Sequence, residues 1–294
     1  MIENNLEDHR YCGRIFTTAE IQKIRTLIAT EPKSQRAQLS RDVCDMFNWL
    51  RPDGRRKDMS CRVAMLRMER DGLITLPKPL CRNGNGRKRP VITSASDPEG
   101  PIDLPAGKLG ALTFQIVDRQ NGSRLWNELI ERYHYLGYKP LPGAQLRYFV
   151  YSGPRLLAAM GFGASAWKVA HRDRFIGWSP QQREQNLHLV VNNARFLILP
   201  WITSRNLASR ILSMAAKQLP LDWKQRYGYE PVLLETFVLS NRFRGICYQA
   251  ANWIHVGQTQ GRGKLDRLHL HALPRKAVFV YPLSKHFRKT LCVE

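Results

Sequence analysis

The chain has 294 residues, of which 43% are hydrophobic. This length favours two domains, and the composition excludes a largely disordered protein. Its 46 Lys and Arg residues outnumber 24 Asp and Glu residues, for a formal charge of +22, which is typical of proteins that bind nucleic acid. No window approaches 18 uncharged apolar residues and the first ten residues are polar, so we expect a cytoplasmic protein without a membrane partner.

Residues 17 to 92 have the pattern of a winged helix-turn-helix. Thr17 and Glu20 form a capping-box pair before the first helix, and Ser34 is placed to cap a second helix. A third helix follows the turn RPDGRRKD and ends at Gly72. Residues 73 to 92, with a glycine-rich centre, predict a β-hairpin wing. We therefore expect a DNA-binding domain over residues 1–92.

Basic residues fall on both elements with which a winged helix contacts DNA. The last helix of a helix-turn-helix enters the major groove, and flanking cations hold phosphates. A spacer or a protein-binding module is the alternative. The candidate DNA-binding residues are Arg55, Arg56, Lys57, Arg62, Arg67, Arg82, Arg87, Lys88 and Arg89.

A linker over residues 93–112 is predicted from their Pro, Gly and Asp content. The domain after it, residues 113–294, begins with a helix and continues with two antiparallel strands. A strand, a long helix, an apolar strand, a helix and a strand complete the order. This alternation predicts an α/β fold with a mixed sheet.

The segment LLETFVLSNRFRGICYQAANWIHVGQT resembles the second half of the GNAT acyltransferase fold. The resemblance covers roughly residues 113–261 and implies a GNAT-like α/β domain in which Tyr248 occupies the place of a general acid. An interior tyrosine that anchors the fold is the alternative. GNAT enzymes bind coenzyme A phosphates with a glycine-containing turn. Here that turn reads RNLASR, with Leu207 and Ala208 in place of glycine, so we do not expect coenzyme A as cofactor.

A wider resemblance rests on RDRFIGWS, NLHLVVNNARFLILPW, PVLLETFV, RFRGICYQAANW, VGQTQGRGK and FVYPL, in this order. These segments resemble the DruA-type family of the Druantia anti-phage system, which also occurs near transposons. The resemblance implies phage defence or mobile-element biology, with DNA and other proteins of that system as partners. Self-association is also compatible with it. It implies no particular reaction.

Glu235 lies within the apolar strand VLLETFV. A buried carboxylate needs a partner, because burying an unpaired charge is costly. Glu235 is therefore a candidate general base or Mg²⁺ ligand. An ion pair with Arg195 of the preceding strand is the structural alternative.

Three further residues complete the catalytic candidates: Asp173 between two arginines, Tyr248 as a possible nucleophile, and His134. With Glu235 they fit a strand-cleaving or strand-transferring enzyme whose cofactor would be Mg²⁺. A two-metal nuclease needs three or more converging carboxylates, so no metal site is assigned.

Arg195 and the loop residues Arg262 and Lys264 are additional candidates for DNA contact, because a basic glycine-rich loop can follow a phosphate backbone. The leading hypothesis is a DNA-binding protein of a defence or mobile-element system. A nuclease or transposase-like enzyme is the alternative, and a GNAT-type acyltransferase is the second.

Overall fold

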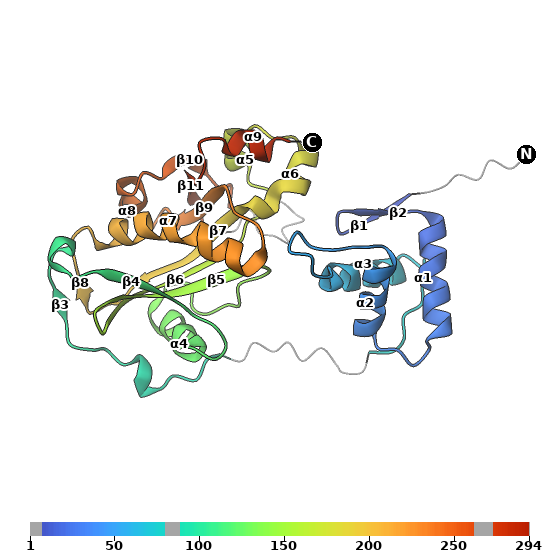
Figure 1. The fold of residues 1–294 in the computed structure, drawn as a ribbon, viewed down its shortest axis with the longest axis horizontal. Helices are drawn as coiled ribbons and strands as arrows, with labels where there is room; N and C mark the ends of the chain where they lie inside the picture. Colours follow the sequence, from blue (N-terminus) through green and yellow to red (C-terminus); the bar gives the residue numbers. More distant parts are fainter. Residues whose placement is uncertain (1–7, 80–88, 262–272, 294) are drawn as a thin grey trace, which may run out of the picture. The chain divides into compact units, whose positions relative to one another are not determined.

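The computed structural model describes residues 8–79, 89–261 and 273–293. The chain divides into two compact units, residues 1–87 and 88–294 (Figure 1). Each unit has its own hydrophobic core.

The N-terminal unit begins with a hairpin that the sequence analysis did not predict. Strands β1 (His9–Tyr11) and β2 (Arg14–Phe16) pair antiparallel around Cys12 and Gly13, both at positive φ. Two consecutive positive φ angles match the twist of a two-residue hairpin turn. Helix α1 (Thr18–Thr30) follows, and the predicted capping box of Thr17 and Glu20 is confirmed.

Helices α2 (Arg36–Met46) and α3 (Asp58–Arg70) follow in this unit. The predicted cap of α2 is wrong: Gln35 precedes the helix without a side-chain cap, and the Ser34 hydroxyl donates to Glu31 instead. Apolar faces of α1, α2 and α3 pack with Phe16 and Trp49, which explains their helical spacing. Between α2 and α3 the chain forms a tight turn closed by a bridge of Leu50 and Arg56.

The two segments expected as strands of the wing, 73–79 and 89–92, contain no strand. Ile74 and Leu76 are buried in the core of the unit. Arg36 donates to the Pro77 carbonyl, and Glu69 accepts from the Leu76 amide. Contacts with helices thus replace strand pairing here, and the expected tip falls outside the described residues.

The segment 93–112, expected as a linker, is part of the second unit. Thr93 donates to buried Glu128 through both its amide and its hydroxyl. Strand β3 (Ile102–Asp103) pairs in parallel with β8 (Ile202–Thr203). The polar composition of residues 93–112 suggested a loop, but hydrogen bonds hold the segment against the rest of the second unit, which is the α/β unit.

A seven-stranded mixed sheet forms the second unit, in the order β10-β11-β9-β7-β6-β5-β4. Among the described strands of this sheet, only the neighbours β7 and β9 run parallel, and they pair over just three residues, Val190–Asn192 with Leu233–Glu235. The strand bounds are β4 Leu112–Ile116, β5 Gln145–Ser152, β6 Arg155–Ala164, β7 Val190–Ile198, β9 Leu233–Leu239, β10 Ile254–Gln258 and β11 Lys276–Pro282. The predicted α/β class with a mixed sheet is confirmed, whereas β4 and β11 were not predicted.

Helices cover both faces of this sheet, with α4 (Ser123–Tyr133) and α7 (Leu207–Tyr227) on opposite sides (Figure 1). Trp126 of α4 donates to the Met160 carbonyl, and Tyr148 donates to Asp222 of α7. The other helices are α5 Ala170–Ile176, α6 Pro180–Asn186, α8 Ile246–Ala250 and α9 Phe287–Leu291. In the part of the chain that the structure describes, no helix combines the length and apolarity needed to cross a membrane.

Candidate functional site

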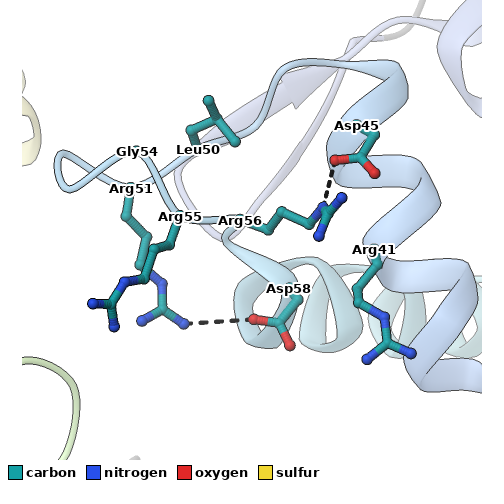
Figure 2. A pocket seen from close by; sticks show the side chains of 8 residues that line it. All are labelled: Arg41, Asp45, Leu50, Arg51, Gly54, Arg55, Arg56 and Asp58. Carbon is teal, nitrogen blue, oxygen red and sulfur yellow. Dashed lines mark hydrogen bonds and ion pairs between the residues drawn. The ribbon is translucent and has the colours of Figure 1, made fainter.

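An open hollow of about 580 Å³ lies at the corner between α2 and α3 (Figure 2). Four arginines and two aspartates supply its charged lining, so positive charge is in excess. The lining residues are Arg41, Asp45, Leu50, Arg51, Gly54, Arg55, Arg56 and Asp58. Arg41 comes from α2, Asp58 begins α3, and the turn between the helices supplies the other arginines.

Ion pairs hold part of this basic lining in place. Arg56 bonds Asp45, which lowers the pKa of that carboxyl, and Arg51 approaches Asp58 at 3.5 Å. The Arg55 side chain is 67% exposed, and its nearest carboxylate, Asp53, lies 3.9 Å away. Solvent-exposed ion pairs of this kind are weak. Their arginines can therefore exchange a carboxylate for another anion.

The exposed face of α3 combines cations with apolar side chains. Arg62 bonds Asp58 at 2.9 Å, and within the described ranges Arg67 has no carboxylate within 4 Å. Met59, Val63 and Leu66 are 55%, 38% and 45% exposed. These apolar residues have helical spacing on a face that the unit's own core leaves uncovered.

Of the predicted DNA-binding residues, Arg55 and Arg56 line this hollow and Lys57 directly precedes α3. Arg62 and Arg67 lie on α3 itself. Sequence reasoning missed Arg41 and Arg51, although Arg51 opens the same basic turn. Arg89 lies in the second unit, with its exposed side chain 3.8 Å from Glu131. The predicted residues Arg82, Arg87, Lys88, Arg262 and Lys264 lie outside the described residues.

Glu235 is fully buried, and its partner is Arg172, not Arg195. Its carboxylate accepts hydrogen bonds from Arg172 and from the Ala166 amide, both at 2.8 Å. Burial raises the pKa of Glu235, and the charge and hydrogen bonds of Arg172 and Ala166 oppose this rise. The buried ion pair links β9 to α5 and its preceding loop.

Asp173 completes the same network from the next position of α5. It accepts two hydrogen bonds from Arg172, at 2.7 and 2.9 Å, and one from the Trp178 ring at 3.1 Å. Its second oxygen accepts from the Val169 amide. Arg172 thus bridges two catalytic candidates, and this arrangement fixes the α5 segment against the sheet.

Tyr248 lies on the opposite face of the sheet from Glu235. It is 7% exposed, donates to Asn193 at 2.8 Å and stacks on Phe279. Phe279 and Val280 alternate on β11, and they pair with Thr236 and Glu235. Because successive side chains point to opposite faces, Tyr248 and Glu235 cannot reach the same group. Burial also raises the pKa of the Tyr248 phenol.

His134, the fourth catalytic candidate, lies beside Arg195 at the end of α4. Its side chain is buried, and its Nδ1 accepts from the Leu136 amide at 3.2 Å. Burial and the nearby guanidinium groups of Arg195 and Arg242 lower the pKa of His134 to about 4. The ring is therefore neutral at pH 7, with its proton on Nε2.

A β-bulge in β7 explains how Arg195 reaches this position. Gly161 pairs with Arg195 and Phe162 pairs with Asn193, so Ala194 is an extra residue. A Cβ on Gly161 would meet Trp126 of α4, whereas Asn193 bonds Tyr248 on the other face. The bulge thus turns Arg195 toward the α4 face. Nothing in the sequence around Ala194 signals it.

The turn before α7 is covered by a neighbouring segment of the same unit. The Ala106 amide donates to the Arg205 carbonyl, and Arg210 donates to the Ala106 carbonyl. Leu207 is buried, where the resemblance to GNAT enzymes would place a glycine. Among the described residues, no three His, Cys, Asp or Glu side chains come together as a metal ligand set.

Comparison with known proteins identifies the family. A family model described as Druantia protein DruA matches residues 67–273. The chain belongs to the DruA family. A search of the curated proteins found no match.

Solved structures that resemble the chain include several acetyltransferases. The ribosomal-protein-S18-alanine N-acetyltransferase from Escherichia coli shares 10% identity at a TM-score of 0.35, covering 59% of this chain and 95% of its own. An acetyltransferase of the GNAT family from Streptococcus pneumoniae shares 10% identity at a TM-score of 0.37, and the match covers 59% of this chain and 100% of that one. YncA from Salmonella typhimurium, a putative acetyltransferase solved with acetyl-CoA, shares 12% identity at a TM-score of 0.37. The match covers 60% of this chain and 96% of that one.

Proposed function

We propose that this DruA-family protein is a DNA-binding component of a bacterial anti-phage system, whose N-terminal unit docks on duplex DNA through its helices α2 and α3 in the manner of a helix-turn-helix. The observation that carries the proposal is the arginine-rich corner between α2 and α3. Family membership supports the anti-phage setting. The formal charge of +22 supports a polyanionic partner.

In this proposal α3 enters the major groove. Arg62 and Arg67 contact phosphates or guanine edges, the usual partners of arginine on DNA. Exposed Met59, Val63 and Leu66 are suited to contact thymine methyl groups, because those methyls line the major groove. This mixed face gives the helix a means of discriminating between sequences.

The turn between α2 and α3 contacts the phosphate backbone. Arg51, Arg55 and Arg56 are held on one tight turn, and their carboxylate partners are exposed or distant. Each phosphate that these arginines neutralise releases counterions, so binding should weaken steeply with salt. The corner would fix register on the duplex while α3 reads the bases.

The proposal is tested by measuring duplex affinity of the full-length protein by fluorescence anisotropy at several salt concentrations. We expect the Arg62→Ala/Arg67→Ala variant to bind about 10- to 100-fold more weakly and to show a shallower salt slope, because two cations leave the interface. Lys23→Ala/Lys33→Ala is the matched control, since it removes two exposed cations from α1 and the loop after it. Equal losses in both double variants would contradict docking through α3.

A further inference from the structure

Arg195 is a buried cation with no partner anion in the part of the chain that the structure describes. Its side chain is only 8% exposed, and its Nε atom is buried without a hydrogen-bond acceptor among the described residues. Its one described hydrogen bond goes from Nη1 to the carbonyl of the adjacent Ala194, at 2.7 Å. A buried guanidinium normally has a carboxylate partner, because desolvating an unpaired charge is expensive. Arg172 in the same unit follows that rule.

More cations gather on the same side of the sheet. Lys276 begins β11, where burial and then the nearby charges of Arg195 and Lys139 lower its pKa. Arg242 follows β9 and lies near His134. Within the described ranges, none of the four cations has a carboxylate within 4 Å; they are Lys139, Arg195, Arg242 and Lys276. The described residues leave their mutual repulsion unrelieved, which indicates that an anion belongs here.

Aromatic rings adjoin this basic group. The Tyr135 and Phe243 ring centroids are 5.2 Å apart, and the Arg242 guanidinium lies 5.2 Å from the Tyr135 ring centroid. Phe243 remains 45% exposed. An exposed aromatic ring beside cations is how proteins hold an unpaired base next to its phosphate. The combination favours a nucleotide over a simple inorganic anion.

We propose that Arg195, His134 and Lys276 bind the phosphate of a nucleotide whose base lies against Phe243. The neutral His134 offers its Nε2–H as a donor, and Arg195 offers its unused Nε–H. The site goes beyond the proposed function, since it lies in the α/β unit and does not involve α3. Its nucleotide is either free or part of a single DNA strand.

The test is calorimetric titration of the full-length protein with deoxyadenosine 5′-monophosphate, deoxyadenosine and inorganic phosphate. We expect the monophosphate to bind at least 10-fold more tightly than either of the other two. Arg195→Gln should weaken its binding at least 10-fold. Failure of the wild-type protein to bind the monophosphate at millimolar concentration would overturn the proposal.

Variants at two exposed residues keep the test valid if Arg195→Gln does not fold. Arg242→Gln and Phe243→Ala remove groups at the rim and should each weaken binding several-fold. Arg244→Gln removes an exposed cation two residues from Arg242 and should leave binding unchanged. Equal effects of Arg242→Gln and Arg244→Gln would show only a general loss of charge and would overturn the site.

A six-nucleotide single strand, titrated in parallel, distinguishes the two sources of nucleotide. Tighter binding of the strand than of the monophosphate, abolished by Phe243→Ala, identifies a DNA strand as the ligand. Equal affinities identify a free nucleotide. Duplex binding by Arg195→Gln should keep the wild-type salt slope, so failure of this site and failure of docking through α3 give different results.

Discussion

The two units of the protein use positive charge in different ways. In the N-terminal unit, arginines stand exposed around an open hollow, and weak ion pairs with surface aspartates orient them. In the α/β unit, Arg172 is buried between two carboxylates, while Arg195 is buried without any among the described residues. Exposed arginines are suited to bind an extended polyanion, whereas a buried arginine is suited to bind a single anion of defined shape. The contrast teaches that net charge alone does not locate a binding site.

Removing the Glu235 carboxylate should have the largest effect on stability. Glu235→Ala leaves the buried Arg172 with Asp173 as its one described carboxylate partner, so we expect the free energy of unfolding to fall by about 3–5 kcal/mol. Urea unfolding measures the change. Glu230→Ala, which removes a half-exposed carboxylate 3.6 Å from Lys224, should cost less than about 1 kcal/mol. Similar losses in the two variants would refute the structural role of the buried network.

Acid should destabilise the α/β unit through His134. Its pKa is lowered to about 4 in the folded protein from an ordinary value of 6.5. The neutral ring therefore contributes stability above pH 6.5, and that contribution is lost as the pH falls toward 4, by about 3 kcal/mol at most. His134→Asn should flatten this part of the stability profile.

Bound nucleotide should reverse part of that effect. A phosphate beside Arg195 neutralises one of the charges that keep His134 unprotonated, so the pKa of His134 should rise on binding. The imidazole resonances followed by NMR at several pH values measure this directly. An unchanged pKa in the presence of saturating monophosphate would place the ligand elsewhere.

A smaller effect is expected from the cap of α1. Thr17→Ala removes the hydroxyl that accepts from the Glu20 amide at 3.2 Å and should cost about 1 kcal/mol. Amide hydrogen exchange in α1 should accelerate about fivefold, while exchange in β6 and β7 stays unchanged. Accelerated exchange in both units would show that their stabilities are coupled.

Sequence reasoning succeeded where local rules dominate. The capping box at Thr17, the apolar spacing of α1 to α3 and the hairpin of β5 and β6 were all predictable. Short elements were missed, such as the three-residue strands β1 and β2, because too few residues show the period. The expected strands of the wing failed because Ile74 and Leu76 pack into a helical core instead.

The candidate sites were predictable only in part. The sequence identified Glu235 as a buried carboxylate, but its partner Arg172 lies on a short helix, α5, that was not predicted. Arg195 was singled out as a cation, yet its environment depends on the bulge at Ala194. Both outcomes depend on tertiary register, which no local pattern encodes.

Salt dependence of duplex binding by the full-length protein tests the central claim most directly. Each lost phosphate contact reduces the slope of log K against log salt by about 0.9. Arg55→Ala/Arg56→Ala should therefore lower the slope by roughly 2, whereas Arg244→Gln, in the other unit, should leave it unchanged. A wild-type slope in the double variant, or an equal reduction in Arg244→Gln, would contradict DNA docking by the N-terminal unit.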